Sequence, residues 1–412
     1  MKSKKVIVVG GGAAGLFCAG IAAKNGAQVL LFEKNEKTGR KLLITGKGRC
    51  NITNFCDNEE FISNIPTNPR FMYSAINAFS TYDTVAFFEE IGVPIKVERG
   101  HRVFPVSDKA MDVCDALCDF VLSNGVKIIT ENVKGLIKKD AEVVGVKTQN
   151  SSYFADSVVV ATGGKSYPRT GSTGDGYSFA KSVGHKVITP TPSLVPLVSD
   201  SPYCKKLQGL SLKNVSIKVT DNKNSTTVYT DFGEMLFTHF GLSGPMILSA
   251  SAHMRDMSDG RYTVHIDFKP ALDEETLSNR LLKDFSKFIN KDICNSLFEL
   301  IPKSFIPVLL DVCEIDPRTK CNSITAKQRK AMVSNLKNFK VNIKAFRPID
   351  EAIITCGGVC VNEIDPKTMK SKIAENLYFA GEVIDVDAYT GGFNLQIAFS
   401  TAYLAGINSA KN

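Results

Sequence analysis

The stretch "KKVIVVGGGAAGLFCAGIAAKNGAQVLLFE", residues 4–33, decides the fold expected for this chain. It runs from an apolar strand through a glycine turn and an alanine-rich helix to a second apolar strand, which is the pattern of a βαβ unit. Gly10, Gly12 and Gly15 let the backbone turn tightly and approach a pyrophosphate at the helix N-terminus. Glu33 ends the second strand, where a carboxylate can accept hydrogen bonds from ribose hydroxyls. The stretch therefore predicts a dinucleotide-binding domain.

The composition predicts a globular protein of two or three domains. The chain has 412 residues, of which 43% are hydrophobic and 22% are charged. Its apolar runs have the length of strands and are too short to span a bilayer, and the N-terminal segment does not have the pattern of a signal peptide. We therefore expect a cytoplasmic protein without a membrane partner.

Charge and cysteine usage point away from two other classes of protein. The net charge is +8, with 50 basic residues scattered among 42 acidic ones and no block of Lys and Arg, so we expect no nucleic-acid partner. The eleven cysteines form no C-x2-C pair and the five histidines are isolated. These patterns predict reduced thiols and no metal site.

Changes in pattern along the chain suggest three domains. Residues 1–190 and 356–412 both show strand, glycine loop and helix, and we predict that they share one Rossmann-like domain. A proline-rich stretch at 189–198 precedes alternating, strand-like segments, which predict a β-barrel-like domain over 191–270 and 338–355. Residues 271–337 have helical spacing and are predicted to form a helical insert.

Three later segments narrow the choice of cofactor. "TGRKLLITGKGRCNITN" (38–54) contains two glycine turns, "VVVATGG" (158–164) is a buried strand that opens into a glycine turn, and "FAGEVIDVDAYTGGFNLQIAF" (379–399) combines an acid, Glu382, with glycines at a helix start. The first segment also contributes the cations Arg40, Lys41, Lys47 and Arg49. Such loops can approach a large planar cofactor while placing donors near its phosphates, which favours FAD.

These segments resemble the BaiN-like NAD(P)/FAD-dependent oxidoreductases, flavoproteins that include bile-acid enone reductases and an aminoacetone oxidase. The resemblance extends over nearly the whole chain and rests on "TGKGRCNITN", "ATGGKSYPRTGSTGDGY", "EMLFTHFGLSGP" and "TMKSKIAENLYFAGEVIDVDAYTGGFNLQ". It implies an α/β fold in which a two-part Rossmann-like FAD domain carries an inserted antiparallel, barrel-like β domain with its own helical insert.

The resemblance also assigns FAD contacts by position. Residues 13–15 would meet the pyrophosphate, Val133 the adenine, and residues 394–396 the pyrimidine edge of the flavin. Together with the glycine turn, the cofactor-binding residues that we expect are Gly10, Gly12, Ala13, Ala14, Gly15, Glu33, Lys34, Arg40, Lys41, Gly46, Lys47, Gly48, Arg49, Cys50, Asn51, Val133, Thr162, Gly163, Gly164, Gly381, Glu382, Asn394, Leu395 and Gln396.

Cys50 and Cys56 raise the alternative of a flavin-dependent disulfide reductase. Such enzymes carry two cysteines shortly after the ribose-binding acid, but with four residues between them, whereas this chain has five. They also carry a second glycine fingerprint for NAD(P)H, which this sequence does not show. We therefore favour Cys50 as a small side chain in a loop beside the flavin.

The sequence predicts an enzyme that acts on a small molecule, with a steroid-like enone as the first candidate. NAD(P)H would reduce FAD, and the flavin would pass hydride to an activated C=C bond of a bile-acid intermediate. An amine oxidase that uses O2 and releases peroxide is the alternative, and a tRNA-modifying flavoprotein is a third hypothesis. No catalytic residue is identified; the weak candidates for a proton donor are Tyr167, His239 and Tyr389, with a buried, hydrogen-bonded role favoured for His239.

Overall fold

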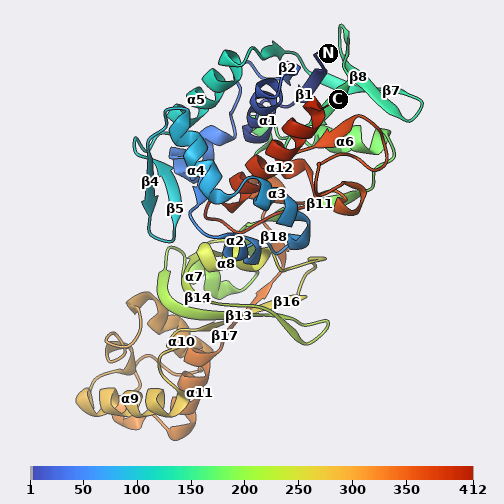
Figure 1. Ribbon diagram of the computed structural model, residues 1–412. Coiled ribbons are helices and arrows are strands. Elements are labelled where there is room, and N and C mark those ends of the chain that lie inside the picture. Colours follow the sequence, from blue (N-terminus) through green and yellow to red (C-terminus); the bar gives the residue numbers. More distant parts are fainter. Residues whose placement is uncertain (1–2, 412) are drawn as a thin grey trace. The chain divides into compact units, whose positions relative to one another are not determined.

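The computed structural model describes residues 3–411 and divides the chain into two compact units. Unit 1 ends at Ser193 and resumes at Pro348, and unit 2 spans Leu194–Arg347 (Figure 1). The predicted β domain and the predicted helical insert thus belong to one compact unit. Residues 348–355, assigned from sequence to the β domain, belong to unit 1.

Unit 1 is built on a parallel five-stranded sheet of order β20-β10-β1-β2-β6. The strands are β1 (Lys5–Val9), β2 (Gln28–Glu33), β6 (Lys127–Thr130), β10 (Ser157–Val160) and β20 (Leu377–Phe379). Val6 to Val9 are all buried, as expected for a strand covered on both faces. β1 pairs in parallel with both β2 and β10, so the first βαβ unit and the last segment of the chain meet in one sheet. The predicted Rossmann-like fold is confirmed.

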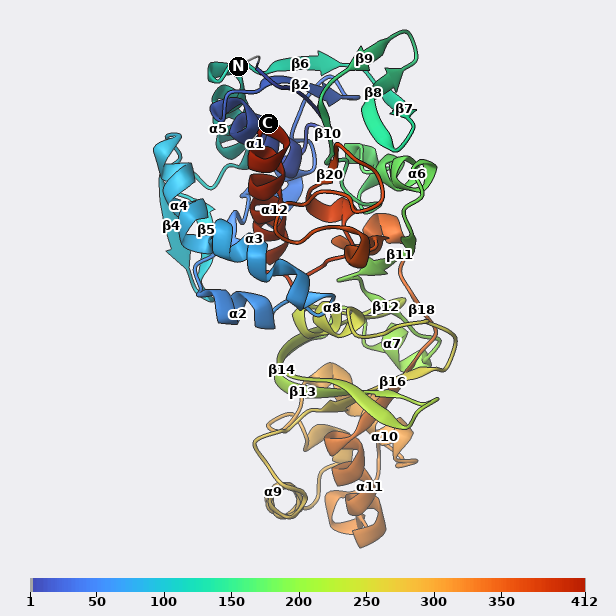
Figure 2. The same ribbon diagram turned by 45° about the vertical axis from the view of Figure 1, so that its right-hand side comes forward.

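Two helices from opposite ends of the chain pack together in unit 1. α1 (Ala13–Lys24) and α12 (Phe393–Ala410) lie side by side in both views (Figures 1 and 2). The helices can approach closely because residue 406 is a glycine. A Cβ at this position would lie 2.9 Å from the backbone oxygen of Cys18. Phe17 adds edge contacts with Phe399 and Phe87. This packing holds the C-terminal segment against the glycine turn at the start of α1.

Smaller elements complete unit 1. The expected meander is present as β7 (Val133–Lys139), β8 (Glu142–Thr148) and β9 (Ser152–Phe154), and β11 (Val187–Ser193) pairs with β19 (Ile354–Val359). The predicted helix near 71–91 is two helices that break at Ser80, whose capping box with Asp83 starts the second. The remaining elements are β3 (Thr53–Asn54), β4 (Ile95–Glu98), β5 (Arg102–Pro105), α2 (Asn58–Ser63), α3 (Tyr73–Ala78), α4 (Thr81–Glu90), α5 (Ala110–Ser123) and α6 (Asp175–Ser182).

Unit 2 is a seven-stranded sheet of order β17-β16-β13-β14-β15-β12-β18 with helices packed on it. Each pair of neighbouring strands in this sheet is antiparallel, as predicted. Its strands are β12 (Leu197–Val198), β13 (Ser211–Asp221), β14 (Thr226–Thr238), β15 (Gly241–Ser243), β16 (Tyr262–Asp267), β17 (Phe339–Ile343) and β18 (Ala345–Phe346). Its helices are α7 (Pro202–Lys206), α8 (Pro245–Ser251), α9 (Glu274–Lys287), α10 (Ile306–Val312) and α11 (Ala326–Lys337). Among residues 3–411, none of the helices has the length and apolar character needed to cross a membrane.

Candidate cofactor site

A pocket in unit 1 begins at the glycine turn between β1 and α1. A Cβ on Gly15 would lie 1.7 Å from the backbone oxygen of Gly10, and a Cβ on Gly10 would lie 2.5 Å from that of Ala161, so the turn tolerates only glycine at these two positions. Gly12, by contrast, lines the pocket, and nothing lies within 4 Å of the Cβ position there. The open space beside Gly12 is where the backbone can receive a pyrophosphate at the N-terminus of α1.

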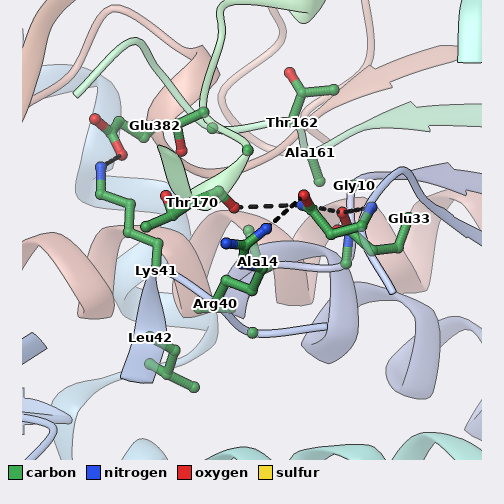
Figure 3. Close-up of a pocket in the computed structure, with 18 of the residues that line it drawn as sticks. Gly10, Ala14, Glu33, Arg40, Lys41, Leu42, Ala161, Thr162, Thr170 and Glu382 are labelled. Atoms are coloured by element: carbon green, nitrogen blue, oxygen red, sulfur yellow. Dashed lines mark hydrogen bonds and ion pairs between the residues drawn. The ribbon is translucent and has the colours of Figure 1, made fainter. Parts of the chain in front are cut away.

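Glu33 closes one side of this turn. Its carboxylate accepts hydrogen bonds from the Gly11 amide at 2.9 Å and from the Asn35 amide at 2.8 Å (Figure 3). Glu33 is 9% exposed and lines the pocket. A buried carboxylate held in this way can accept further hydrogen bonds from ribose hydroxyls but repels a phosphate.

The opposite wall joins three distant segments through Glu382. One carboxylate oxygen of Glu382 receives Lys41 Nζ at 2.6 Å, and the other accepts from the Ser166 hydroxyl at 2.9 Å and the Thr355 amide at 3.0 Å. Figure 3 shows Lys41 and Glu382 reaching toward one another. Sequence reasoning selected Lys41 and Glu382 but missed Ser166 and Thr355. Thr355 carries no motif of its own and was assigned from sequence to the β domain.

Many of the predicted residues line this one pocket. They are Gly10, Gly12, Ala13, Ala14, Glu33, Lys34, Arg40, Lys41, Val133, Thr162, Gly163, Glu382, Asn394 and Leu395. The pocket therefore extends from the meander at Val133, past the glycine turn, to the start of α12. Pocket residues that the sequence did not single out include Asn35, Leu42, Thr45, Thr170 and Ile354. Their side chains have no distinctive spacing that could have identified them.

Ten predicted residues do not line the pocket. They are Gly15, Gly46, Lys47, Gly48, Arg49, Cys50, Asn51, Gly164, Gly381 and Gln396. Arg49 pairs with Glu98 and with Asp108 at 2.6 Å, and its guanidinium lies 4.1 Å from the centre of the Phe104 ring. The charge of Arg49 is therefore paired with Glu98 at the end of β4 and with Asp108 after β5, and its expected contact with the flavin stays a prediction.

Gln396 is also placed differently from the prediction. It is 0% exposed, its amide oxygen accepts from the hydroxyls of Thr53 and Thr84 at 2.6 and 2.8 Å, and its amide nitrogen donates to Ser400 and to the Phe79 carbonyl. The side chain thus has no group left to offer to a ligand. Gln396 lies on the buried side of α12, so its side chain is not available for the flavin contact that the resemblance implied.

Asn394 supports the loop before α12. Its side-chain oxygen accepts from the Ala388 amide at 2.9 Å, and its nitrogen donates to the Ala388 carbonyl at 2.7 Å. Asn54 donates to the Gly391 carbonyl at 3.2 Å in the same loop. Asn394 therefore holds this loop in addition to lining the pocket.

Cys50 and Cys56 do not have the environment of a redox pair. Both are buried, and all eleven cysteines are free thiols. Burial raises the pKa of each of the two thiols to about 12, so both remain protonated at neutral pH. Because the thiolate is the reactive form, this environment argues against a disulfide reductase.

The three proton-donor candidates lie in different parts of the chain. Tyr167 is half-buried with a left-handed backbone, and its ring centre lies 6.0 Å from Lys41 Nζ. Tyr389 is half-buried in the loop that Asn394 holds. His239 is exposed in the turn between β14 and β15 of unit 2, so the expected buried role for this residue is wrong. Within residues 3–411, no group of three or more His, Cys, Asp and Glu side chains could hold a metal ion.

The fold and the pocket at its glycine turn define the Rossmann-like class of protein, and sequence comparison identifies the family. Residues 4–408 match the model of the HI0933-like protein Rossmann domain, and the chain belongs to this family of FAD-dependent oxidoreductases. It is 31% identical over 99% of both chains to a 3-dehydro-bile acid delta(4,6)-reductase of Clostridium scindens. It is also 30% identical to a ribosomal RNA dihydrouridine synthase of Escherichia coli, over 98% of this chain and 97% of the relative.

Solved structures show the same fold at low sequence identity. The 3-ketosteroid-delta4-(5alpha)-dehydrogenase of Rhodococcus jostii aligns with a TM-score of 0.53 and 14% identity, covering 99% of this chain and 97% of that chain. This likeness concerns the fold alone.

Proposed function

We propose that the chain is an FAD-dependent reductase of a C=C bond conjugated with a carbonyl group, with NAD(P)H as the electron donor. The observation that carries the proposal is the pocket of unit 1, which joins the glycine turn, Glu33, the Lys41–Glu382 pair and the start of α12. When bound, FAD supplies the hydride-transfer chemistry that amino-acid side chains do not have.

The residues of the pocket fit FAD in charge and shape. The open side of Gly12 can receive the pyrophosphate, and Glu33 can accept hydrogen bonds from the adenosine ribose. Arg40 is exposed at the rim and donates to the Asn35 side chain at 2.9 Å, which leaves further guanidinium N–H groups for a phosphate. Glu382, next to Lys41, can accept from ribityl hydroxyls.

The names of the two relatives describe the same type of bond. A 3-dehydro bile acid with delta(4,6) unsaturation has C=C bonds conjugated with the 3-oxo group, and dihydrouridine differs from uridine by saturation of a C=C bond conjugated with the ring carbonyl. In both substrates the β-carbon can accept a hydride while the conjugated carbonyl oxygen takes up negative charge. A steroid-like enone is our first candidate substrate, and a uridine in ribosomal RNA is the second.

The test is an anaerobic titration of the purified, FAD-loaded protein. We expect NADH or NADPH to bleach the yellow absorbance, and a 3-oxo-4-ene bile acid or a uridine-containing RNA to restore it with stoichiometric loss of the substrate double bond. Bleaching by an amine alone, followed by peroxide release in air, would instead establish an amine oxidase. A protein that binds no FAD on reconstitution would refute the proposal.

A further inference from the structure

One face of the unit 2 sheet carries exposed polar side chains, among them Thr230, Lys340 and Asn342. On β13, Val215, Ile217 and Val219 are buried in the core of the unit, whereas Lys218 is exposed on the alternate side. β14 and β16 pair with β13 on either side, and β17 pairs with β16. Because successive side chains of a strand point to opposite faces, the polar side chains of these four strands share one surface.

A row of basic side chains crosses this surface. Lys218 on β13 lies opposite His265 on β16, and His265 lies opposite Lys340 on β17. Directly opposite side chains in a sheet are about 5 Å apart, so the two lysines lie on either side of His265, whose ring nitrogens contact Asn338 Oδ1 at 2.7 Å and the Thr220 hydroxyl at 3.0 Å. Asp267, opposite Ser216 on the same face, pairs with Lys337 at 2.6 Å. In the part of the chain that the structure describes, neither Lys218 nor Lys340 has a carboxylate partner. An external anion would compensate the charge of both ammonium groups.

A hollow adjoins the row and is lined by hydroxyl and amide groups. Its lining residues are Thr220, Asn222, Ser225, Thr263, His265, Lys340 and Asn342, and no carboxylate is among them. The Thr263 hydroxyl donates to the side-chain oxygen of Asn342 at 3.0 Å, which directs the amide nitrogen of Asn342 away from this bond. Lys340 and the uncharged donors and acceptors around it suit a ligand that combines anionic and hydroxyl groups.

An exposed aromatic ring lies on the same surface. Phe232 on β14 is 59% exposed and lies opposite Ser216, two residues before Lys218 on β13. Its neighbour on the same face, Thr230, lies opposite Lys218. A phenylalanine ring beside lysines on a polar sheet can stack with a base while the lysines hold the backbone phosphates.

We propose that the surface formed by Lys218, Thr220, Thr230, Phe232, His265 and Lys340, here named the Lys218 face, binds single-stranded RNA. Lys218 and Lys340 pair with phosphates, Phe232 stacks with a base, and the hydroxyl- and amide-lined hollow contacts ribose 2′-hydroxyls. The charge of unit 2 favours an anionic partner, because this unit contains 22 Lys and Arg residues and 16 Asp and Glu residues. The sequence-based expectation of no nucleic-acid partner rested on the absence of a basic block, and the row forms only when three strands pair.

This inference deepens the proposed function and rests on its second candidate substrate, an RNA. Its test needs neither FAD nor turnover, so a failure to bind RNA leaves the FAD-dependent reduction of an enone unaffected. The test is fluorescence anisotropy of a labelled oligouridylate with the full-length protein over a series of salt concentrations. We expect the double variant K218Q/K340Q to bind about tenfold or more weakly, with the salt-dependence slope reduced by about two. We expect F232A to weaken binding by about fivefold or more with the slope unchanged, because stacking is not an ionic contact.

The matched control is K283Q/K303Q, which removes the same charge from exposed positions of unit 2 outside the Lys218 face. This variant should bind like the wild type, and the melting temperatures of all variants should agree. An oligodeoxyuridylate should bind more weakly than the ribose form. The proposal is overturned if the wild type binds no RNA, if K218Q/K340Q binds as tightly as K283Q/K303Q, or if heparin binds equally well and F232A changes nothing.

Discussion

Lys41 Nζ lies 2.6 Å from Glu382 Oε2, although 340 residues separate the two in the chain. The lysine follows the first βαβ unit and the glutamate follows the last strand of the same sheet, and β10 and β1 bring these two segments together. The side chains are 22% and 13% exposed, so the pair is largely shielded from water. Such a pair holds its geometry more firmly than a surface pair does.

We predict that Lys41→Met destabilises the protein by about 1–3 kcal/mol, because it leaves the shielded Glu382 carboxylate without a cation. Urea unfolding measures this change. The double variant K41M/E382Q should recover part of the loss, since the uncompensated charge is removed. Lys24→Met is the control, because Lys24 and Glu90 form a 3.4 Å pair with side chains 54% and 67% exposed. An equally large effect of Lys24→Met would contradict the prediction.

We predict that Glu33→Gln lowers the affinity for FAD by about tenfold or more. The substitution removes the charge and replaces a hydrogen-bond acceptor with a donor beside the Gly11 and Asn35 amides. Fluorescence titration of the apoprotein with FAD gives the affinity. Glu36→Gln changes the same charge at an exposed position three residues on and should have little effect. Equal affinities of the two variants would refute the assigned role of Glu33.

We predict that Gly392→Ala disrupts the loop before α12, whereas Gly48→Ala is tolerated much better. Both glycines have a positive φ, but a Cβ on Gly392 would lie 2.2 Å from the backbone carbon of Thr53, while nothing lies within 4 Å of one on Gly48. Gly48→Ala should therefore cost only the backbone strain of about 1 kcal/mol. Melting temperature and FAD content are the measurements. Similar values for the two variants would show that the contact with Thr53 is unimportant.

We predict that Cys50→Ala makes stability less sensitive to alkaline pH. Burial raises the pKa of the Cys50 thiol to about 12, above its unfolded value of about 8.5. Because the native state retains this proton longer than the unfolded state, the contribution of the thiol is complete below about pH 8.5 and is lost as pH rises toward 12. The loss amounts to about 1.4 kcal/mol per pH unit within that window. Urea unfolding at pH 8 and at about pH 10 should show a smaller decline in Cys50→Ala than in the wild type.

We predict that the variant with serine at both Cys50 and Cys56 binds FAD and turns over substrate. The two thiols are buried and protonated, so neither can act as the nucleophile of a dithiol mechanism. FAD content and steady-state rate check this expectation, with Cys204→Ser, another buried thiol, as the control for the insertion of a hydroxyl. Loss of turnover with FAD still bound would reopen the redox role.

The features that could be predicted depend on local signals in the sequence, and those that could not depend on long-range contacts. The glycine turn at Gly10 and the acid at Glu33 could be recognised because strand, turn and helix are adjacent in sequence and their spacing alone sets their geometry. Arg49 also comes directly after a glycine turn, but its guanidinium pairs with Asp108, which is 59 residues further along the chain. The sequence shows that a cation is present but does not show which carboxylate competes for it.

The sequence by itself determined the Rossmann-like class, the glycine turn and the segments that contribute to the pocket. Only the tertiary structure decided that Thr355 joins Glu382, that Gln396 is enclosed by Thr53, Thr84 and Ser400, and that Lys218, His265 and Lys340 form one row. The physical reason is that side-chain partners depend on strand order and helix packing. Both bring together residues that no local pattern relates.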